Sequence, residues 1–267
     1  MGFVETAAAW DRVADTYVTS VVPMVESLAA EALRVAAVPR GGRIVDVACG
    51  PGTLAHLAAR QGLWVTAIDY SPIMIARLRT RPGVPKVAAV IGDGMALPYA
   101  GGSFDAGFSM FGVMFFPEPA AGLAELARVL RPGGRAVVTS WVAAERRPLR
   151  QAAYDILDEI APGTAAEPVL APSDREACRA VMAAGGFIDV KVSEFATSIE
   201  MPSTEAFVDY FSRVQPAVAA LREGLGHRWA EVGAELLTRL RAEVGPGPHR
   251  IPLVANVSVG RRPPARQ

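Results

Sequence analysis

The chain has 267 residues, 51% of them hydrophobic, which is enough to bury one large core with an accessory layer but leaves little for two full domains. Its 27 basic and 27 acidic residues give a formal net charge of zero, so nucleic acid is not expected as a partner. The first residues lack a basic leader before a long apolar run, and no later run reaches membrane-spanning length. We therefore expect a cytoplasmic protein without a membrane partner.

Helices and strands alternate over the first half of the chain, a pattern typical of an α/β protein with a doubly wound, mostly parallel sheet. Helical spacing of apolar residues predicts two amino-terminal helices, at residues 10–17 and 25–38. The expected strands lie at residues 44–48, 64–69, 88–92, 104–109 and 135–141, with crossover helices at residues 53–61, 72–79 and 120–130. Pro132, Gly133 and Gly134 form a turn that leads into the fifth strand.

Two further apolar strands, at residues 187–195 and 254–260, complete a sheet of seven strands. Before the sixth strand, residues 146–172 form an insert rich in Ala and Pro. Ser173 and Glu176 have the spacing of a capping box, which predicts the start of a helix that runs to Ala184 and ends at two glycines.

A helical cap is predicted between the last two strands. Residues 203–244 carry apolar side chains at helical spacing, at Phe207, Tyr210, Phe211 and Val214 and then at Leu221, Leu225, Trp229, Val232, Leu236 and Leu240. Taken singly, each of these residues fits a small satellite core. As a set they favour two or three helices, within residues 196–250, that close over the carboxyl edge of the sheet, where ligands of such folds bind.

The most informative stretch is RIVDVACGPGTLAHLA at residues 43–58, which joins an apolar strand to a glycine turn and a helix start. Gly50 and Gly52 let the backbone turn sharply, and the free N–H groups of the first helical turn face a ligand. With Ala55, and with Asp69 downstream, they also match a loose dinucleotide fingerprint. The glycine pattern alone therefore leaves both an NAD-type oxidoreductase and a nucleoside-binding enzyme open.

Three carboxylates decide between these two kinds of site. Asp46 lies inside the first strand, where its charge would repel the pyrophosphate of a dinucleotide. Asp69 ends the next strand, where a carboxylate accepts hydrogen bonds from both hydroxyls of a ribose, and Asp93 follows the third, where it accepts from the amino group of a purine. A nucleoside with a cationic tail, such as S-adenosylmethionine, therefore fits better than NAD.

Four sequence blocks occur in order over the first half of the chain: VDVACGPG at 45–52, AIDYSPIMI at 67–75, GDGMALPYAGGSFD at 92–105 and LRPGG at 130–134. With them the chain resembles the class I S-adenosylmethionine-dependent methyltransferases, and within these the small-molecule group that includes the ubiquinone and menaquinone methyltransferases. The resemblance implies a Rossmann-like methyltransferase fold in a single domain of residues 1–267, in which helices of residues 1–40 cover the cofactor. It also implies that the last two strands form a hairpin antiparallel to the rest.

The resemblance further implies S-adenosylmethionine as cofactor, with S-adenosylhomocysteine as product, and the residues that bind it. Asp46 belongs to the methionine end, Asp69 to the ribose and Asp93 to the adenine edge. The full implied set is Tyr17, Asp46, Ala48, Gly50, Gly52, Asp69, Tyr70, Met74, Asp93, Gly94, Met95 and Ser109. Ala48 departs from the family, which has glycine at this position.

The implied reaction is attack by an acceptor in line with the sulfur–methyl bond, which needs alignment and exclusion of water more than acid or base assistance. The loop FSMFGVMFFPEP at 108–119 is dense in apolar side chains, which either line an acceptor pocket or pack a helix onto the sheet. The expected pocket residues are Met110, Phe111, Met114, Phe207, Tyr210 and Phe211. The acceptor is then a hydrophobic small molecule such as a phenol, quinone, terpenoid or polyketide-like compound.

A catalytic base is not evident, and the candidates are His227, Tyr210 and Glu194, whereas His249 is interpreted as structural. No metal is expected, since Cys49 and Cys178 lack metal-type spacing. A cyclisation or rearrangement in secondary metabolism on the same scaffold stays an alternative. The protein is expected to be a monomer or a homodimer.

Overall fold

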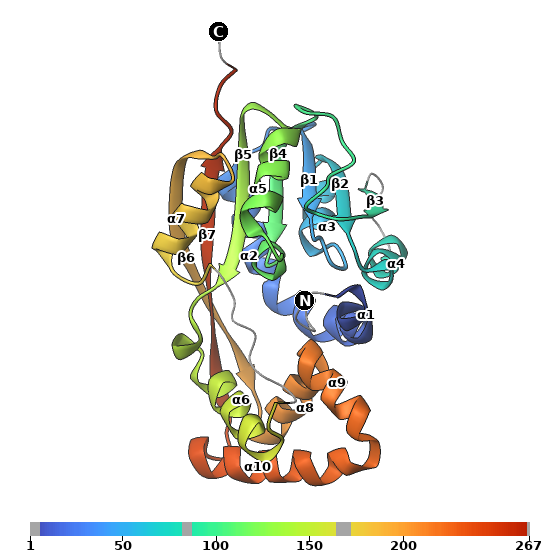
Figure 1. Cartoon of the computed structure of the whole chain (residues 1–267), viewed down its shortest axis with the longest axis vertical. Helices are drawn as coiled ribbons and strands as arrows, with labels where there is room; N and C mark the ends of the chain where they lie inside the picture. Colours follow the sequence, from blue (N-terminus) through green and yellow to red (C-terminus); the bar gives the residue numbers. More distant parts are fainter. Residues whose placement is uncertain (1–5, 82–86, 164–171, 266–267) are drawn as a thin grey trace.

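We describe the protein from a computed structural model, which covers residues 6–81, 87–163 and 172–265. Seven strands form one sheet in the order β3-β2-β1-β4-β5-β7-β6 (Figure 1). They are β1 (Arg43–Val47), β2 (Trp64–Asp69), β3 (Val87–Ile91), β4 (Phe104–Met110), β5 (Leu130–Trp141), β6 (Ile188–Met201) and β7 (His249–Arg261). This is the seven-stranded, mostly parallel sheet that the sequence predicts.

The direction of the sixth strand corrects one expectation. Strands β1 to β5 are parallel, β7 is antiparallel to β5, and β6 is antiparallel to β7. Of the last two strands, only β7 therefore opposes the rest, and β6 runs with the first five. The expectation that both would oppose the sheet was wrong, because two adjacent antiparallel strands cannot both run against it.

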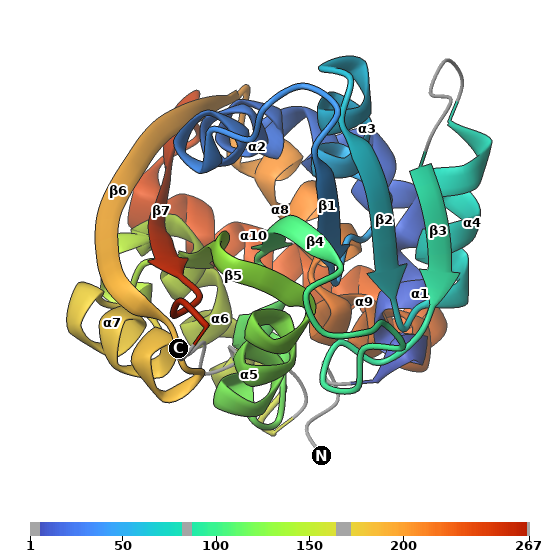
Figure 2. The same ribbon diagram turned by 90° about the horizontal axis from the view of Figure 1, so that it is seen from above.

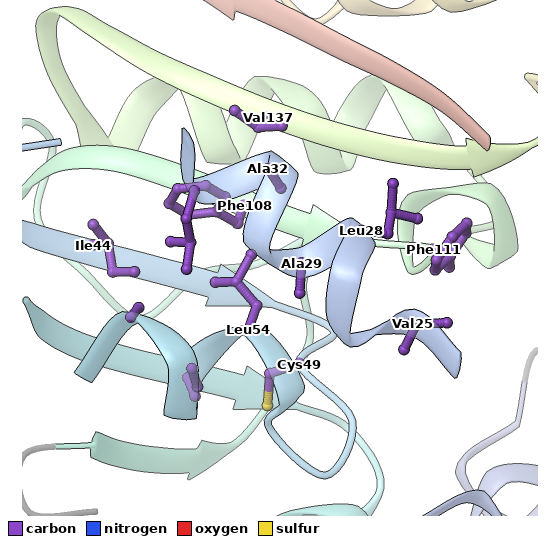
Figure 3. Packing of buried hydrophobic residues seen from close by; sticks show 14 of the residues in the cluster. Val25, Leu28, Ala29, Ala32, Ile44, Cys49, Leu54, Phe108, Phe111 and Val137 are labelled. Carbon is purple, nitrogen blue, oxygen red and sulfur yellow. The ribbon is translucent and has the colours of Figure 1, made fainter. Parts of the chain in front are cut away.

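Helices cover both faces of the sheet (Figure 2). Helices α2 (Val22–Ala36) and α3 (Thr53–Arg60) pack on one face, and α5 (Pro119–Val129) and α7 (Arg175–Ala184) pack on the other. On the first face Phe108 lies between Ile44 and Ala32, beneath Val137 (Figure 3). Helix α4 (Pro72–Thr80) packs beside β2 and β3. Helix α2 lies against the sheet and contributes to its core.

Helix α7 and strand β5 start at different residues from those predicted. The N-cap of α7 is Asp174, whose carboxylate accepts a hydrogen bond from the Ala177 amide at 2.8 Å, and not Ser173. Both residue types are good N-caps, so the sequence pattern did not discriminate between them. Strand β5 starts at Leu130, and the predicted turn lies within it, with Gly133 at φ +75°. The Gly133 amide donates to the Arg262 carbonyl, and the Arg262 amide donates to the Gly134 carbonyl. These two bonds keep the predicted turn within the strand.

Beyond the sheet, β6 and β7 continue as a two-stranded ribbon. Strand β5 pairs with β7 only from Ala255 to Arg261, whereas β6 pairs with β7 down to His249 (Figure 1). The ribbon carries α8 (Thr204–Val214), α9 (Pro216–Leu225), the 3-10 turn η5 (Gly226–Arg228) and α10 (Trp229–Val244) between its strands. The sequence predicts two or three helices here, and these three follow Ser203, which is the N-cap of α8.

One more helix joins this group. The insert after β5 forms η4 (Ala144–Arg146) and α6 (Pro148–Ile160), and α6 packs against α10. Helix α6, the end of β6 and helices α8 to α10 share a hydrophobic core of their own, separate from the two on the sheet. We call α6, α8, α9, α10 and the ribbon the helical cap. No helix in the described ranges is long and apolar enough to cross a membrane.

Candidate functional site

The turn after β1 is held in an unusual backbone conformation. Ala48, Gly50 and Gly52 have φ values of +54°, +53° and +80°, in the left-handed region. A Cβ on Gly52 would lie 2.7 Å from Leu78 Cγ, whereas a Cβ on Gly50 would meet no atom within 4 Å. Glycine at 52 is thus required by packing, and Gly50 borders open space into which a ligand can come close to the backbone.

Asp69, at the end of β2, ties this turn to the neighbouring strand. Its Oδ2 accepts a hydrogen bond from the Gly50 amide at 2.8 Å, and its Oδ1 accepts one from the Ser71 amide at 2.9 Å. Burial raises the pKa of Asp69 to about 6, although these two bonds lower it. A carboxylate has about four acceptor sites, so Asp69 retains capacity for two ligand hydroxyls.

Asp46 is a buried carboxyl group beneath the turn. It is 1% exposed, and within the described part of the chain neither of its oxygens has a hydrogen-bond partner. Burial raises the pKa of Asp46 to about 8, and the charge of Asp69 adds to this. An unpaired buried carboxyl next to an open backbone cradle suits a cationic ligand, whose charge offsets that of the acids. The site therefore fits S-adenosylmethionine, which carries a sulfonium and an ammonium.

A cavity of about 200 Å³ opens at the carboxyl ends of β1 to β4. Of the residues predicted for the cofactor, it brings together Tyr17, Ala48, Gly50, Asp69, Tyr70, Met74, Asp93, Gly94 and Met95. It is also lined by Trp10, Gly92, Met110, Phe111, Gly112, Phe115, Phe116 and Pro117. Asp46, Gly52 and Ser109 do not line it, because all three lie behind the wall, where Asp46 and Ser109 are buried.

Helix α1 (Ala7–Thr16) lies between the sheet and α9 (Figure 1), and its Trp10 lines this cavity. The Asp11 carboxylate accepts hydrogen bonds from the Ser71 hydroxyl at 2.5 Å and from the Ile73 amide at 3.2 Å, at the start of α4. A carboxylate is favourable at a helix N-terminus. On the other side of α1, Arg12 pairs with Glu223 of α9. The helix therefore connects the sheet to the helical cap.

A larger cavity of about 460 Å³ lies between the sheet edge and the helical cap. Of the predicted acceptor residues, Phe111, Phe207, Tyr210 and Phe211 line it. Met110 lines the smaller cavity instead, and Met114 lines neither, because its side chain is buried in the core. Residues that sequence analysis did not assign to a pocket include Trp141, Arg147, Arg150, Tyr154 and the ribbon residues from Pro248 to Leu253.

The two cavities share four aromatic residues, Trp10, Tyr17, Phe111 and Phe115, which we call the aromatic partition. The rings of Trp10 and Phe115 pack edge to face with centroids 5.0 Å apart. Phe111 stacks on Trp141 at 4.0 Å and has φ +57°, which is rare for a bulky residue. Tyr17 starts a π-helical turn, η2 (Tyr17–Val21), and such turns are frequent at functional sites.

Of the three candidate bases, only Tyr210 lines a described cavity. Tyr210 lines the larger cavity, and burial raises its pKa to about 12 while the charge of Arg150 opposes the shift. His227 is exposed on η5, and Glu194 is held by Arg146 at 2.8 Å, so neither lines a described cavity. A feature that sequence analysis missed is His249, which lines the larger cavity. Its Nε2 lies 2.8 Å from the hydroxyl of buried Thr204.

Comparison with known proteins identifies the sheet half of the site. A family model described as "Methyltransferase domain" matches residues 45–138. The demethylmenaquinone methyltransferase of Beutenbergia cavernae is 43% identical over 101 residues, which are 38% of this chain and 41% of the relative. The chain contains a class I S-adenosylmethionine-dependent methyltransferase domain. The cofactor of such a domain is S-adenosylmethionine, in agreement with the carboxylates around the smaller cavity.

Solved structures are similar to most of the chain, and at this low identity the similarity concerns the fold alone. A Bacillus halodurans protein described as a methyltransferase has a TM-score of 0.62 at 18% identity, covering 89% of this chain and 99% of the other. The [4+2]-cyclase SpnF has a TM-score of 0.56 at 23% identity, covering 90% and 81%. The sequence match spans less than half of the length of the Beutenbergia relative.

Proposed function

We propose that this protein transfers a methyl group from S-adenosylmethionine to a hydrophobic small molecule held in the larger cavity. One observation carries the proposal: the two cavities meet at the aromatic partition, and the smaller one lies in the methyltransferase domain. When bound in the smaller cavity, S-adenosylmethionine supplies an electrophilic methyl group. An acceptor in the larger cavity then reaches it past Trp10, Tyr17, Phe111 and Phe115, which line both cavities.

The residues of the smaller cavity divide the work of binding. Asp69 is proposed to accept the ribose hydroxyls, Asp93 the adenine amino group, and Asp46 to attract the cationic tail from beneath the turn. Tyr70 and Met74 supply flat and apolar contacts to the base. The 2.8 Å bond from the Met95 amide fixes the Asp93 carboxylate.

The partition and the cap are proposed to contribute to the reaction by alignment and by exclusion of water. Holding two reactants in near-attack geometry supplies up to about 7–11 kcal/mol of the barrier reduction. Aromatic walls on both sides of the transfer point keep water out, which suits a reaction that needs little proton transfer. The acceptor is proposed to be a phenol, quinone, terpenoid or polyketide-like compound, because most of the larger cavity is lined by apolar side chains.

Isothermal titration calorimetry with S-adenosylmethionine tests the cofactor site. The wild-type chain is expected to bind it, and Asp69→Ala to weaken binding by about tenfold or more, because the ribose loses its acceptor and the turn loses its tie to β2. Asp189→Ala, which removes an exposed carboxylate of β6, is the control and leaves binding unchanged. Undiminished binding in Asp69→Ala would refute the assignment.

A cyclisation or rearrangement in the larger cavity is the second candidate function. The similarity to a [4+2]-cyclase shows that this fold is compatible with such chemistry, without favouring it at 23% identity. Release of S-adenosylhomocysteine with a converted acceptor separates the two functions. A converted acceptor of unchanged mass, with no S-adenosylhomocysteine, would establish the second.

A further inference from the structure

The charged residues on the wall of the larger cavity are mostly positive. Arg147, Arg150 and Arg250 line it, and Glu243 is the one carboxylate among its described lining residues. Arg250 is engaged with the ribbon, since its Nε donates to the Ser198 hydroxyl at 2.8 Å. Arg147 and Arg150 lie at the start of α6. These arginines place guanidinium groups on an otherwise apolar wall.

Arg150 is the better placed of these two arginines. Its guanidinium lies over the ring of Tyr154, 5.3 Å from the centroid, and Tyr154 packs edge to face against Phe211 at 4.9 Å. Both rings line the larger cavity. The N–H donors of a guanidinium suit a carboxylate or sulfonate. The contact with Tyr154 therefore holds a group that can bind an anion at the cavity wall.

Arg150 also lies toward the aromatic partition. Tyr154 packs against Phe211 of α8, and α8 contacts α1 and η2, the elements that carry Trp10 and Tyr17 of the partition. The other end of the cavity lies far from the partition. Trp141 pairs with Ala255 of β7. His249 lies six residues from Ala255 along β7, about 20 Å at the usual rise of a strand. Packed elements therefore connect Arg150 to the partition, whereas His249 lies toward the far end of the cavity.

We propose that the acceptor is an apolar acid, such as an aromatic or polyketide-like carboxylic acid or an acidic phenol, and that Arg150 binds its anionic group beside the aromatic partition. The inference rests on the proposed function, because it names the class of molecule that occupies the larger cavity. Tyr154 holds the guanidinium at the cavity wall, and Phe207 and Phe211 contact the apolar body.

Two fluorescent dyes with the same ring system test the proposal on protein saturated with S-adenosylhomocysteine. One is 1-anilinonaphthalene-8-sulfonate, and the other is N-phenyl-1-naphthylamine, which lacks the sulfonate. Arg150→Gln is expected to weaken the sulfonate dye about tenfold and the neutral dye less than twofold. Arg150→Lys retains most of the sulfonate affinity. Arg150→Met, which keeps an apolar stem over Tyr154, gives the same selective loss as Arg150→Gln.

Arg213→Gln is the matched control, because Arg213 is on α8 but outside the cavity, paired with Asp209 at 2.7 Å, and its loss leaves both dyes unchanged. Equal weakening of both dyes in the Arg150 variants would overturn the proposal, since it would assign Arg150 to packing. No weakening of either dye would overturn it as well. The proposed function fails separately, when the wild-type protein does not bind S-adenosylhomocysteine in calorimetry.

Discussion

At the scale of single residues, Ala48 and Gly112 form a compensated pair. Ala48 stands where the family has glycine and keeps the left-handed conformation that glycine favours. A Cβ added to Gly112 would lie 2.3 Å from the Ala48 Cβ and 2.8 Å from the Ser109 hydroxyl. The methyl group of Ala48 is therefore accommodated because position 112 has none.

The pair makes a prediction for a double-mutant cycle. Gly112→Ala is expected to destabilise the protein by about 1–3 kcal/mol through overpacking, and Ala48→Gly to change stability by less than about 1 kcal/mol. The double variant recovers part of the loss, because the clash between the two methyl groups disappears. Urea unfolding followed by tryptophan fluorescence measures all four proteins. Additive effects of the two substitutions would show that the residues are not coupled.

At the scale of elements, local patterns were sufficient for the sheet. Strand β2 has the predicted bounds, and β1, β3 and β4 differ by a residue or two, because each is a short apolar run between turn residues. Strand β6 continues past Phe195 to Met201, where polar residues interrupt the apolar alternation that indicates a strand. Its true end depends on pairing with β7, a contact between distant segments that no local pattern encodes.

The cofactor residues were also predictable from local sequence patterns, whereas the acceptor cavity was not. The predicted residues that line the smaller cavity follow strands in sequence or lie on η2 and α4, and the family blocks mark most of them. The larger cavity draws on α6, α8 and the ribbon, which lie far apart in the chain. Arg150 and His249 carry no local signal, and only the packing of the helical cap on the sheet gives them a role.

Helix α1 is the element whose position the cofactor site depends on most. Asp11→Ala removes the carboxylate that holds α1 on the start of α4, and a capping interaction of this kind is worth about 1 kcal/mol. We expect the dissociation constant for S-adenosylhomocysteine to rise about fivefold or more in calorimetry, because Trp10 and Tyr17 line the cavity from this end of the chain. Hydrogen exchange of residues 7–16 is expected to become faster.

The control for α1 is Asp15→Ala, which removes an exposed ion pair with Arg77 and leaves affinity within twofold. An unchanged dissociation constant in Asp11→Ala, with faster exchange of α1, would show that the helix is not part of the cofactor site.

At the scale of the whole molecule, the buried acids of the site make stability depend on pH. The pKa of Asp46 is raised to about 8 in the folded state, above its unfolded value near 3.8, so the folded protein binds more protons between these values and loses stability as pH rises. His56 acts in the opposite sense: burial lowers its pKa to about 4, so its contribution to stability grows up to about pH 6.5 and then stays constant. Asp69, with a pKa of about 6, is largely ionised above this pH.

The window from pH 6.5 to 8 therefore isolates Asp46. The free energy of unfolding, from urea titrations in the absence of ligand, is expected to fall by about 1–2 kcal/mol across it, since one proton corresponds to about 1.4 kcal/mol per pH unit. Asp46→Asn flattens the curve, and Glu176→Gln, which alters an exposed carboxyl, does not. Saturating S-adenosylmethionine also flattens it, because its cationic groups favour the ionised carboxylate. An equal slope in the wild type and in Asp46→Asn would mean that Asp46 is not the titrating group and does not attract the cofactor through its charge.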